Sequence, residues 1–164
     1  MIVLGVDPGT LRLGYSFIQA ENINKIKVLS SGVIIPSNKD SIYKRLGFIL
    51  KELEKLINYF NPDAVSLEKS FYGKNVSTAI SLGEVRGVVL SLAGKYNKIL
   101  EEYTPMAIKK SVTGRGNSDK EAVARMVKKI LGIKKDFEYN DESDAIAISL
   151  AYVYRSKFNN TQKK

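Results

Sequence analysis

The hydrophobic pattern of the first 35 residues predicts three β-strands joined by short turns. Residues 2–6 are continuously apolar, as in a strand buried on both faces, and Pro8 and Gly9 end this run. A second strand is predicted at 14–20 and a third within 25–35, after a short polar turn. These short connections predict an antiparallel meander.

From residue 40 onward the pattern indicates helices that alternate with strands. Apolar residues recur at helical spacing from 42 to 60, with Asp40 or Ser41 as the cap and Asn61-Pro62 as the end. The further elements predicted are a buried, parallel fourth strand at 64–67, a helix rich in small residues at 75–94, a fifth strand at 98–103, a short helix after Thr104-Pro105, a helix between a Ser118–Glu121 capping box and Gly132, and a last helix from Asp141 to about Phe158. The order predicts one α/β domain over residues 1–158, with a mixed five-stranded sheet flanked by helices, and a flexible basic tail at 159–164.

The composition favours a polyanionic partner. The 164 residues carry a formal net charge of +9. Residues 109–164 hold 13 Lys and Arg against seven Asp and Glu, whereas residues 1–108 hold 13 against ten. Such an excess attracts nucleic acid by releasing its counterions, but solubility alone would explain the same charge.

The absence of two residue types limits the chemistry. The chain has no Cys and no His, which excludes disulfides, thiolate metal sites and any His-based triad. Metal binding would use oxygen ligands, which favours Mg²⁺ or Mn²⁺. The start of the sequence shows no basic leader, and no apolar stretch approaches membrane-spanning length, so we expect a cytoplasmic protein without membrane contact.

Four acidic residues lie at the ends of predicted elements. Asp7 and Glu68 follow buried strands that would be parallel neighbours, so both carboxylates would emerge at one edge of the sheet. Asp141 and Asp144, spaced i, i+3, begin the last helix and share a face. Four converging carboxylates repel one another unless divalent cations lie between them, so the set predicts a metal site.

Each acid also has an ordinary explanation. Asp141 and Asp144 are acceptable as a helix cap and an acid that faces the helix dipole, and Glu68 as a surface acid at a strand end. Asp7, after five apolar residues, is harder to explain as a solvated acid. The joint pattern, and no single residue, favours the metal site.

Five segments, in order along the chain, resemble the RuvC-type Holliday junction resolvases. These segments are Val6-Asp7-Pro8-Gly9-Thr10 with Gly14-Tyr15, the run from Leu67 to Asn75, Leu82-Gly83-Glu84-Val85-Arg86-Gly87, Lys109-Lys110-Ser111-Val112-Thr113-Gly114, and the run from Asp141 to Ala147. The resemblance extends from residue 1 to about residue 155. Asp-Pro-Gly-Thr alone also resembles the phosphate loops of sugar-kinase-like ATPases, whose fold is related.

The resemblance implies a ribonuclease H-like fold and a metal-dependent endonuclease for four-way DNA junctions in recombination and repair. It implies that Asp7, Glu68, Asp141 and Asp144 bind two Mg²⁺ ions, with Mn²⁺ as a possible substitute, although some relatives have His in place of Asp141. It also implies active-site lysines, at Lys109 and Lys120, which would stabilise charge on the phosphate. A solvated surface position is the alternative for both lysines.

Five further residues are candidates for contact with DNA. By resemblance, Phe71 contacts unstacked bases, and we add Tyr72 and Lys74, which follow it, together with Lys110 and Arg115. The alternatives are a core position for Phe71 and a solvated loop charge for Arg115.

Junction cleavage at two symmetry-related points predicts a homodimer. The small-residue helix at 75–94 is a candidate for the contact between subunits, although packing on its own sheet explains the same composition. The resemblance also implies a branch-migration helicase complex as a partner. Two alternative functions are a non-catalytic junction-binding scaffold and a phosphate-handling ATPase of the related fold.

Overall fold

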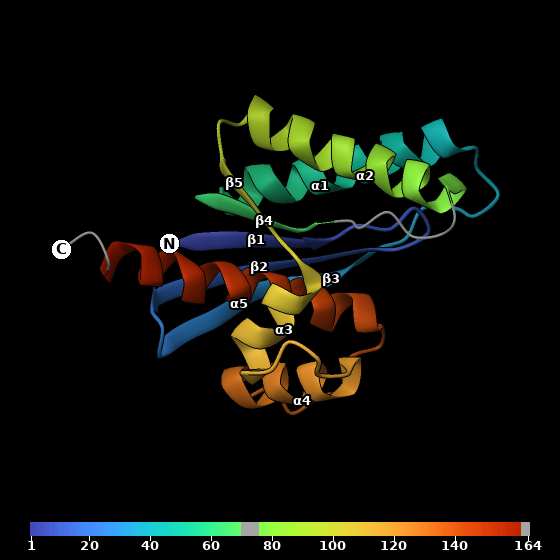
Figure 1. The fold of residues 1–164 in the computed structure, drawn as a ribbon. Helices are drawn as coiled ribbons and strands as arrows, with labels where there is room; N and C mark the ends of the chain where they lie inside the picture. Colours follow the sequence, from blue (N-terminus) through green and yellow to red (C-terminus); the bar gives the residue numbers. More distant parts are fainter. Residues whose placement is uncertain (70–75, 162–164) are drawn as a thin grey trace.

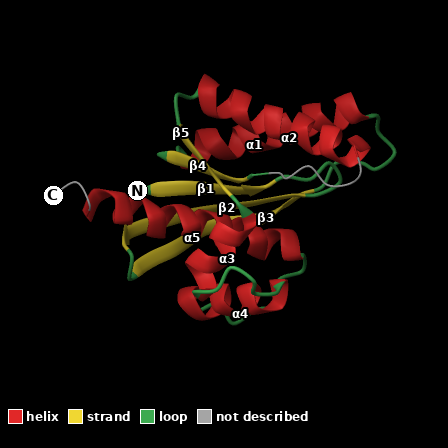
Figure 2. Cartoon of the chain, viewed as in Figure 1, coloured by secondary structure: helices red, strands yellow, loops and turns green. Residues whose placement is uncertain are grey.

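The computed structural model describes residues 1–69 and 76–161, with side chains to Ser156, and shows a five-stranded sheet between two layers of helices (Figures 1 and 2). The elements are β1 (Ile2–Asp7), β2 (Leu13–Asn22), β3 (Lys25–Ile34), α1 (Ile42–Phe60), β4 (Ala64–Glu68), α2 (Val76–Lys95), β5 (Ile99–Tyr103), α3 (Pro105–Thr113), α4 (Lys120–Leu131) and α5 (Asn140–Thr161). The predicted order of elements is confirmed in the described residues.

The sheet is mixed, with the strand order β3-β2-β1-β4-β5. The strands β1, β2 and β3 form an antiparallel meander, and β4 lies parallel to both β1 and β5. In the register of β1 and β4, Val6 lies beside Leu67. The next residues, Asp7 and Glu68, therefore end neighbouring strands at the same edge of the sheet, as predicted from the sequence.

The two faces of the sheet bury separate hydrophobic clusters. Leu4 and Phe17 pack with Ile49 and Leu53 of α1, and the same cluster includes Val89 of α2. On the opposite face, alternate strand residues pack against α5, and α3 and α4 lie on the far side of this helix (Figure 2). α5 therefore lies between the sheet and the α3–α4 pair, which explains its nearly continuous buried sequence.

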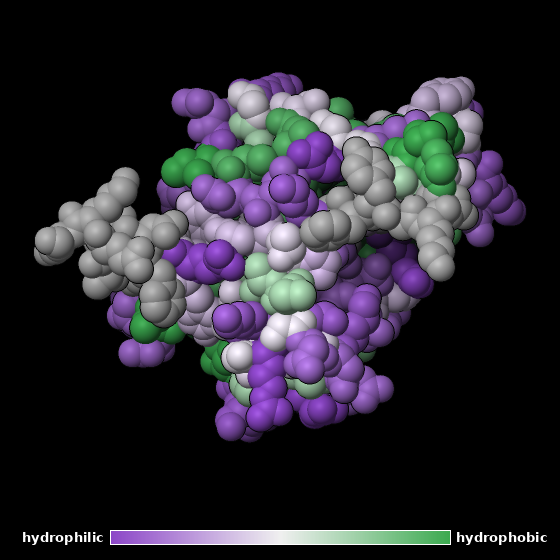
Figure 3. All heavy atoms as spheres, viewed as in Figure 1, coloured by the Kyte–Doolittle hydropathy of each residue, from purple (hydrophilic) through white to green (hydrophobic). Residues whose placement is uncertain are grey.

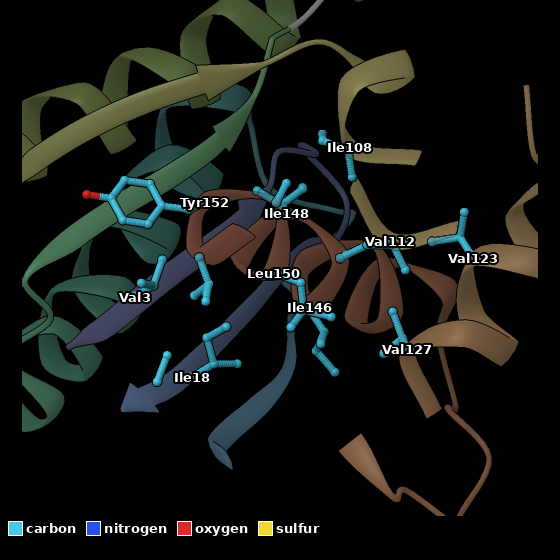
Figure 4. Close-up of a cluster of buried hydrophobic side chains, with 14 of the residues drawn as sticks. Val3, Ile18, Ile108, Val112, Val123, Val127, Ile146, Ile148, Leu150 and Tyr152 are labelled. Carbon is cyan, nitrogen blue, oxygen red and sulfur yellow. The ribbon is translucent and has the colours of Figure 1, made fainter. Parts of the chain in front are cut away.

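The backbone of α5 approaches the backbones of β1 and β2 closely, because glycines of the two strands lie at the contact. A Cβ atom on Gly5 would collide with Ser149 and with the carbonyl oxygen of Ala145, and one on Gly14 would collide with the carbonyl oxygen of Asp141. The buried hydroxyl of Ser16 donates to the Ala145 carbonyl oxygen, at 2.9 Å. Hydrophobic residues of α5, including Ile146 and Leu150, fill the space between these contacts and α3–α4 (Figure 4). The first turns of α5 are thus fixed relative to the end of β1.

The helix ends confirm most of the sequence signals, with one error. Asn61 and Gly132 end α1 and α4, as predicted, and both adopt the left-handed conformation. The cap of α4, however, is Asp119 and not Ser118: the Asp119 carboxylate accepts a hydrogen bond from the Ala122 amide, at 2.6 Å. Ser118 is instead hydrogen-bonded to Thr113 in the preceding loop, at 2.8 Å between the two hydroxyl oxygens, so the predicted capping box does not form.

The helix α2 has two different faces. Val85, Val89 and Leu92 are buried in the cluster with α1, whereas a Cβ atom on Gly83, Gly87 or Gly94 would meet open space. By length and composition, α2 is apolar enough to cross a membrane, with a mean hydropathy of 1.4, so our expectation that no stretch reaches that length was wrong. Its buried face belongs to the core of the domain.

We predict that Gly5→Ala destabilises the protein by about 1–3 kcal/mol, since the added methyl group must push α5 away from β1. Chemical denaturation measures the change in the free energy of unfolding. The matched control is Gly47→Ala, in α1, where the added Cβ atom meets nothing within 4 Å. This control should be stabilised by about 0.5–1 kcal/mol, because alanine favours the helix. Equal effects of the two substitutions would contradict the close contact.

Candidate active site

Three of the four predicted acids line one pocket at the carboxyl edge of the sheet, of about 180 Å³, together with two lysines. We call this site the acidic pocket. It is lined by Asp7, Glu68, Asp144, Lys109, Lys120, Pro105, Ile108, Val123 and Ala147. Residues from β1, β4, α3, α4 and α5 meet there, so distant parts of the sequence converge as the strand and helix ends predicted.

The hydrophobic cluster between α5 and the α3–α4 pair positions the pocket residues. Ile108 and Val123 belong both to this cluster and to the pocket wall (Figure 4). Lys109 follows Ile108 in α3, and Lys120 is the first residue of α4. The packing that holds α3 and α4 on α5 therefore also brings the two lysines to the acids.

The carboxylates of the acidic pocket are in electrostatic conflict. Burial, followed by repulsion from Asp144, Glu68 and Asp141, raises the pKa of Asp7 to about 8. Burial and the Asp144 carboxylate also raise the pKa of Glu68. Burial and the neighbouring carboxylates therefore favour the protonated form of Asp7 at neutral pH in the chain without metal.

The two lysines supply part of that charge. Lys120 donates a hydrogen bond to the Asp144 carboxylate, with 3.0 Å between Nζ and Oδ2, and this bond raises the pKa of Lys120. Lys109 acts on Glu68 and lowers its pKa, against the larger effect of burial. Both lysines thus interact with the acids rather than standing alone on the surface.

Asp141 does not line the acidic pocket. Its carboxylate pairs with Arg12, with 3.4 Å between Oδ2 and Nε, although it is close enough to contribute to the raised pKa of Asp7. Among the residues that the structure describes, no three acids are grouped closely enough to hold a metal ion between them. The structure therefore brings Asp7, Glu68 and Asp144 to one pocket without closing them around a metal position, and it leaves Asp141 outside the pocket lining.

The chemistry of the donors nevertheless fits a hard divalent cation. Every acidic ligand here offers oxygen, and the sequence contains no His or Cys to bind a softer metal. A cation between Asp7, Glu68 and Asp144 would offset both the burial and the repulsion that raise the pKa of Asp7. To complete such a site, the side chains of Asp141 and Lys120 would have to leave their present partners.

Two of the five predicted DNA-contact residues can be placed, and neither lines the acidic pocket. Phe71, Tyr72 and Lys74 fall outside the described residues. Lys110 is exposed in the last turn of α3, and Arg115 is exposed in the loop that follows. The backbone of this loop is ordered by Thr113, whose hydroxyl donates to the Arg115 carbonyl oxygen, at 2.9 Å.

Sequence reasoning missed Arg12 and Tyr139. Arg12 lies in the β1–β2 loop, and its guanidinium Cζ stands 5.4 Å from the centre of the Tyr139 ring, just before α5. The available signal was the position of Arg12, a single cation in a short turn that follows the buried Asp7. Nothing in the sequence pattern indicates its pairing with Asp141.

Comparisons of the sequence give a consistent result. A family model described as "Crossover junction endodeoxyribonuclease RuvC" matches residues 3–152. The protein of that name from Finegoldia magna is 43% identical over 159 residues, with 96% of each chain covered. The one from Alkaliphilus oremlandii is 39% identical over 158 residues, again with 96% of each chain covered.

Comparisons of the structure agree. The T. thermophilus RuvC chain in complex with a Holliday junction substrate superposes with a TM-score of 0.91 at 30% identity, covering 97% of this chain and 96% of that one. The yeast mitochondrial Holliday junction resolvase Ydc2 superposes with a TM-score of 0.71 at 16% identity, covering 98% and 83%, and shows the fold alone. The expected ribonuclease H-like fold is thereby confirmed.

We predict that Asp7→Asn stabilises the chain in EDTA at pH 7.5. The unfolded chain loses the Asp7 proton near pH 3.8, but the folded chain keeps it to about pH 8, so Asp7 increasingly opposes folding as the pH rises between these values. The amide removes this effect and should add roughly 1–4 kcal/mol to the free energy of unfolding, or about 2–10 °C to Tm.

Thermal unfolding of the wild type and the variant at pH 5 and pH 7.5 measures the gain, which should be larger at pH 7.5. Asp40→Asn, at an exposed position outside the pocket, is the control and should change little. An Asp7→Asn chain no more stable than the wild type at pH 7.5 would show that the Asp7 carboxylate is well solvated.

Proposed function

This chain belongs to the RuvC family of crossover junction endodeoxyribonucleases, and we propose that it resolves four-way DNA junctions by paired, symmetric hydrolysis of phosphodiester bonds. The acidic pocket is the observation that supports this proposal in the chain itself. It unites Asp7, Glu68 and Asp144 with Lys109 and Lys120 in one cavity. The role in DNA recombination and repair follows from this activity.

Nucleases of this family are metal-dependent. We infer Mg²⁺ as the metal, two ions per site, with Mn²⁺ as a substitute, held by Asp7, Glu68 and Asp144 and joined by Asp141. Bound there, such ions supply an activated water and neutralise charge on the leaving oxygen. The all-oxygen donors and the unrelieved repulsion at Asp7 support this inference.

The side chains of the pocket would bind and orient the scissile phosphate. Lys109 and Lys120 line the pocket together with the acids, and their ammonium groups would hold phosphate oxygens as charge develops on them. Ile108 and Val123 form an apolar wall, which limits the access of bulk water to the reacting atoms. Lys120 would exchange the Asp144 carboxylate for the phosphate when a cation takes its place.

The DNA would lie across the basic part of the molecule next to this pocket. Much of the surface over α3 and α4 is hydrophilic in Figure 3. Lys110 at the end of α3 and Arg115 in the loop after it are both exposed. We propose phosphate contacts for these two residues. Phe71, Tyr72 and Lys74 follow Glu68 closely in sequence. We propose that Phe71 stacks on unpaired bases and that Tyr72 and Lys74 contact the DNA beside it.

We propose a homodimer that uses the outward face of α2. Val76 and Ile80 are 72% and 59% exposed, and they share a heptad-like spacing with Gly83, Gly87 and Gly94. A second copy of α2 could approach such a surface closely, because the glycines present no side chains. A two-fold axis there would give the paired sites that symmetric cleavage requires.

Two further proposals come from the family alone. We place the enzyme in the cytoplasm, where its DNA substrate lies in bacteria, and we propose a branch-migration helicase complex as its partner. Neither depends on the geometry of the acidic pocket.

We predict that Asp7→Asn and Asp144→Asn each reduce cleavage of a synthetic four-way junction in Mg²⁺ by roughly 10³-fold or more, because an amide does not neutralise the cations. Junction binding should persist. Gel analysis of labelled strands measures both. Asp136→Asn, at an exposed acid paired with Lys128, is the control. Near-normal cleavage by either variant would contradict the assigned site. If the wild type binds the junction but cleaves it with none of the divalent ions tested, a non-catalytic scaffold is favoured.

We predict that Ile80→Lys shifts the protein from dimer to monomer in sedimentation velocity, because it places a charge in the proposed interface. Ile23→Lys, at a 48% exposed position in the β2–β3 turn, should leave the dimer intact. If both variants sediment as the wild type does, α2 is not the interface.

A further inference from the structure

The two acids in the first turns of α5 are each paired with a cation from a different element. Asp144 pairs with Lys120 of α4 at 3.0 Å, and Asp141 pairs with Arg12 of the β1–β2 loop at 3.4 Å. Each cation offsets negative charge near the pocket, although both carboxylates still repel Asp7 and raise its pKa. Of these two acids, Asp144 lines the acidic pocket and Asp141 does not.

The position of Arg12 is well defined. Gly9 packs against the carbonyl oxygen of Arg12 so closely that a Cβ atom would collide there, which keeps the loop tightly folded. The guanidinium also lies over the Tyr139 ring, at 5.4 Å from Cζ to the ring centre. Arg12 therefore stands beside the start of α5, in contact with both Asp141 and Tyr139.

Arg12 also borders an open groove of about 510 Å³. The other lining residues are Leu11, Ile35, Pro36, Ser37, Asn38 and Tyr139. No acidic residue lines this groove within the described part of the chain. The groove gives the guanidinium room to swing away from Asp141 while it keeps the ring of Tyr139.

We propose that Arg12 is a positioning residue that holds Asp141 away from Asp7, Glu68 and Asp144 until a divalent cation enters the acidic pocket. The inference rests on the proposed function, because it assumes that this pocket binds the cation. When the cation binds, the Asp141 carboxylate exchanges the guanidinium for it, and Arg12 moves into the groove. Arg12 therefore lowers the metal affinity of the chain without DNA.

The size of the effect follows from the exposure of the pair. The side chain of Arg12 is 52% exposed and that of Asp141 is 27% exposed, so solvent screens their attraction. Removal of such an ion pair should release Asp141 and tighten metal binding roughly two- to fivefold. Loss of one positive charge near the acids would also tighten binding in general, so the test must separate the two effects.

The experiment is a Mn²⁺ titration of the full chain without DNA, followed by the electron paramagnetic resonance signal of free Mn²⁺. Four proteins form a double-mutant cycle: the wild type, Arg12→Ala, Asp141→Asn and the double variant. We expect Arg12→Ala to lower the Kd roughly two- to fivefold when Asp141 is present. In the Asp141→Asn chain the decrease should be smaller, because only the general loss of charge acts there. Arg12→Lys, which keeps a cation, should stay near the wild type.

Lys39→Ala controls for charge, because Lys39 is exposed and follows Asn38 of the groove. It should leave the Kd unchanged. The proposal is overturned if Arg12→Ala binds Mn²⁺ no more tightly than the wild type, or if it tightens binding equally in the Asp141→Asn chain. If the wild type binds no Mn²⁺, the metal site itself is wrong and the role of Arg12 fails with it. Circular dichroism confirms that each variant is folded.

Discussion

The close contact of α5 with β1 and β2 is the constraint on which the rest of the structure depends. Gly5 and Gly14 allow the helix backbone to touch the strands, and Ser16 forms a buried hydrogen bond across the contact. Because the helix is fixed at this distance, its acidic first turns stand beside the ends of β1 and β4. The acids of the candidate site are therefore held together by backbone packing. Their own interaction is repulsive.

Much of this arrangement was readable in the sequence. The apolar run before Asp7 and the parallel fourth strand before Glu68 were sufficient to place both carboxylates at one edge, and the register of Val6 with Leu67 confirms it. Periodicity succeeds here because β1 and β4 are buried on both faces and α1 and α4 each bury one apolar side.

The errors have a common physical origin, which is competition among local partners. Ser118 and Asp119 are both good helix caps, and the choice between them depends on Thr113, which takes the Ser118 hydroxyl. In the same way, Asp141 and Asp144 have equivalent positions in sequence terms, but Arg12 engages one and Lys120 the other. Which partner wins is decided by tertiary proximity, and a one-dimensional pattern does not contain it. The two faces of α2 were likewise hidden, because small residues carry almost no periodic signal.

The acidic pocket has walls of two different kinds. Asp7 and Glu68 stand on the central strands of the sheet, whereas Lys109 and Lys120 stand on α3 and α4, which contact the rest of the fold largely through α5. A loosening of that outer helical layer, by heat or by pressure, would carry the positive groups away while the negative ones stayed in place. Enzyme inactivation on warming would then precede global unfolding. The sheet would still be intact when the two lysines had already moved away from the acids.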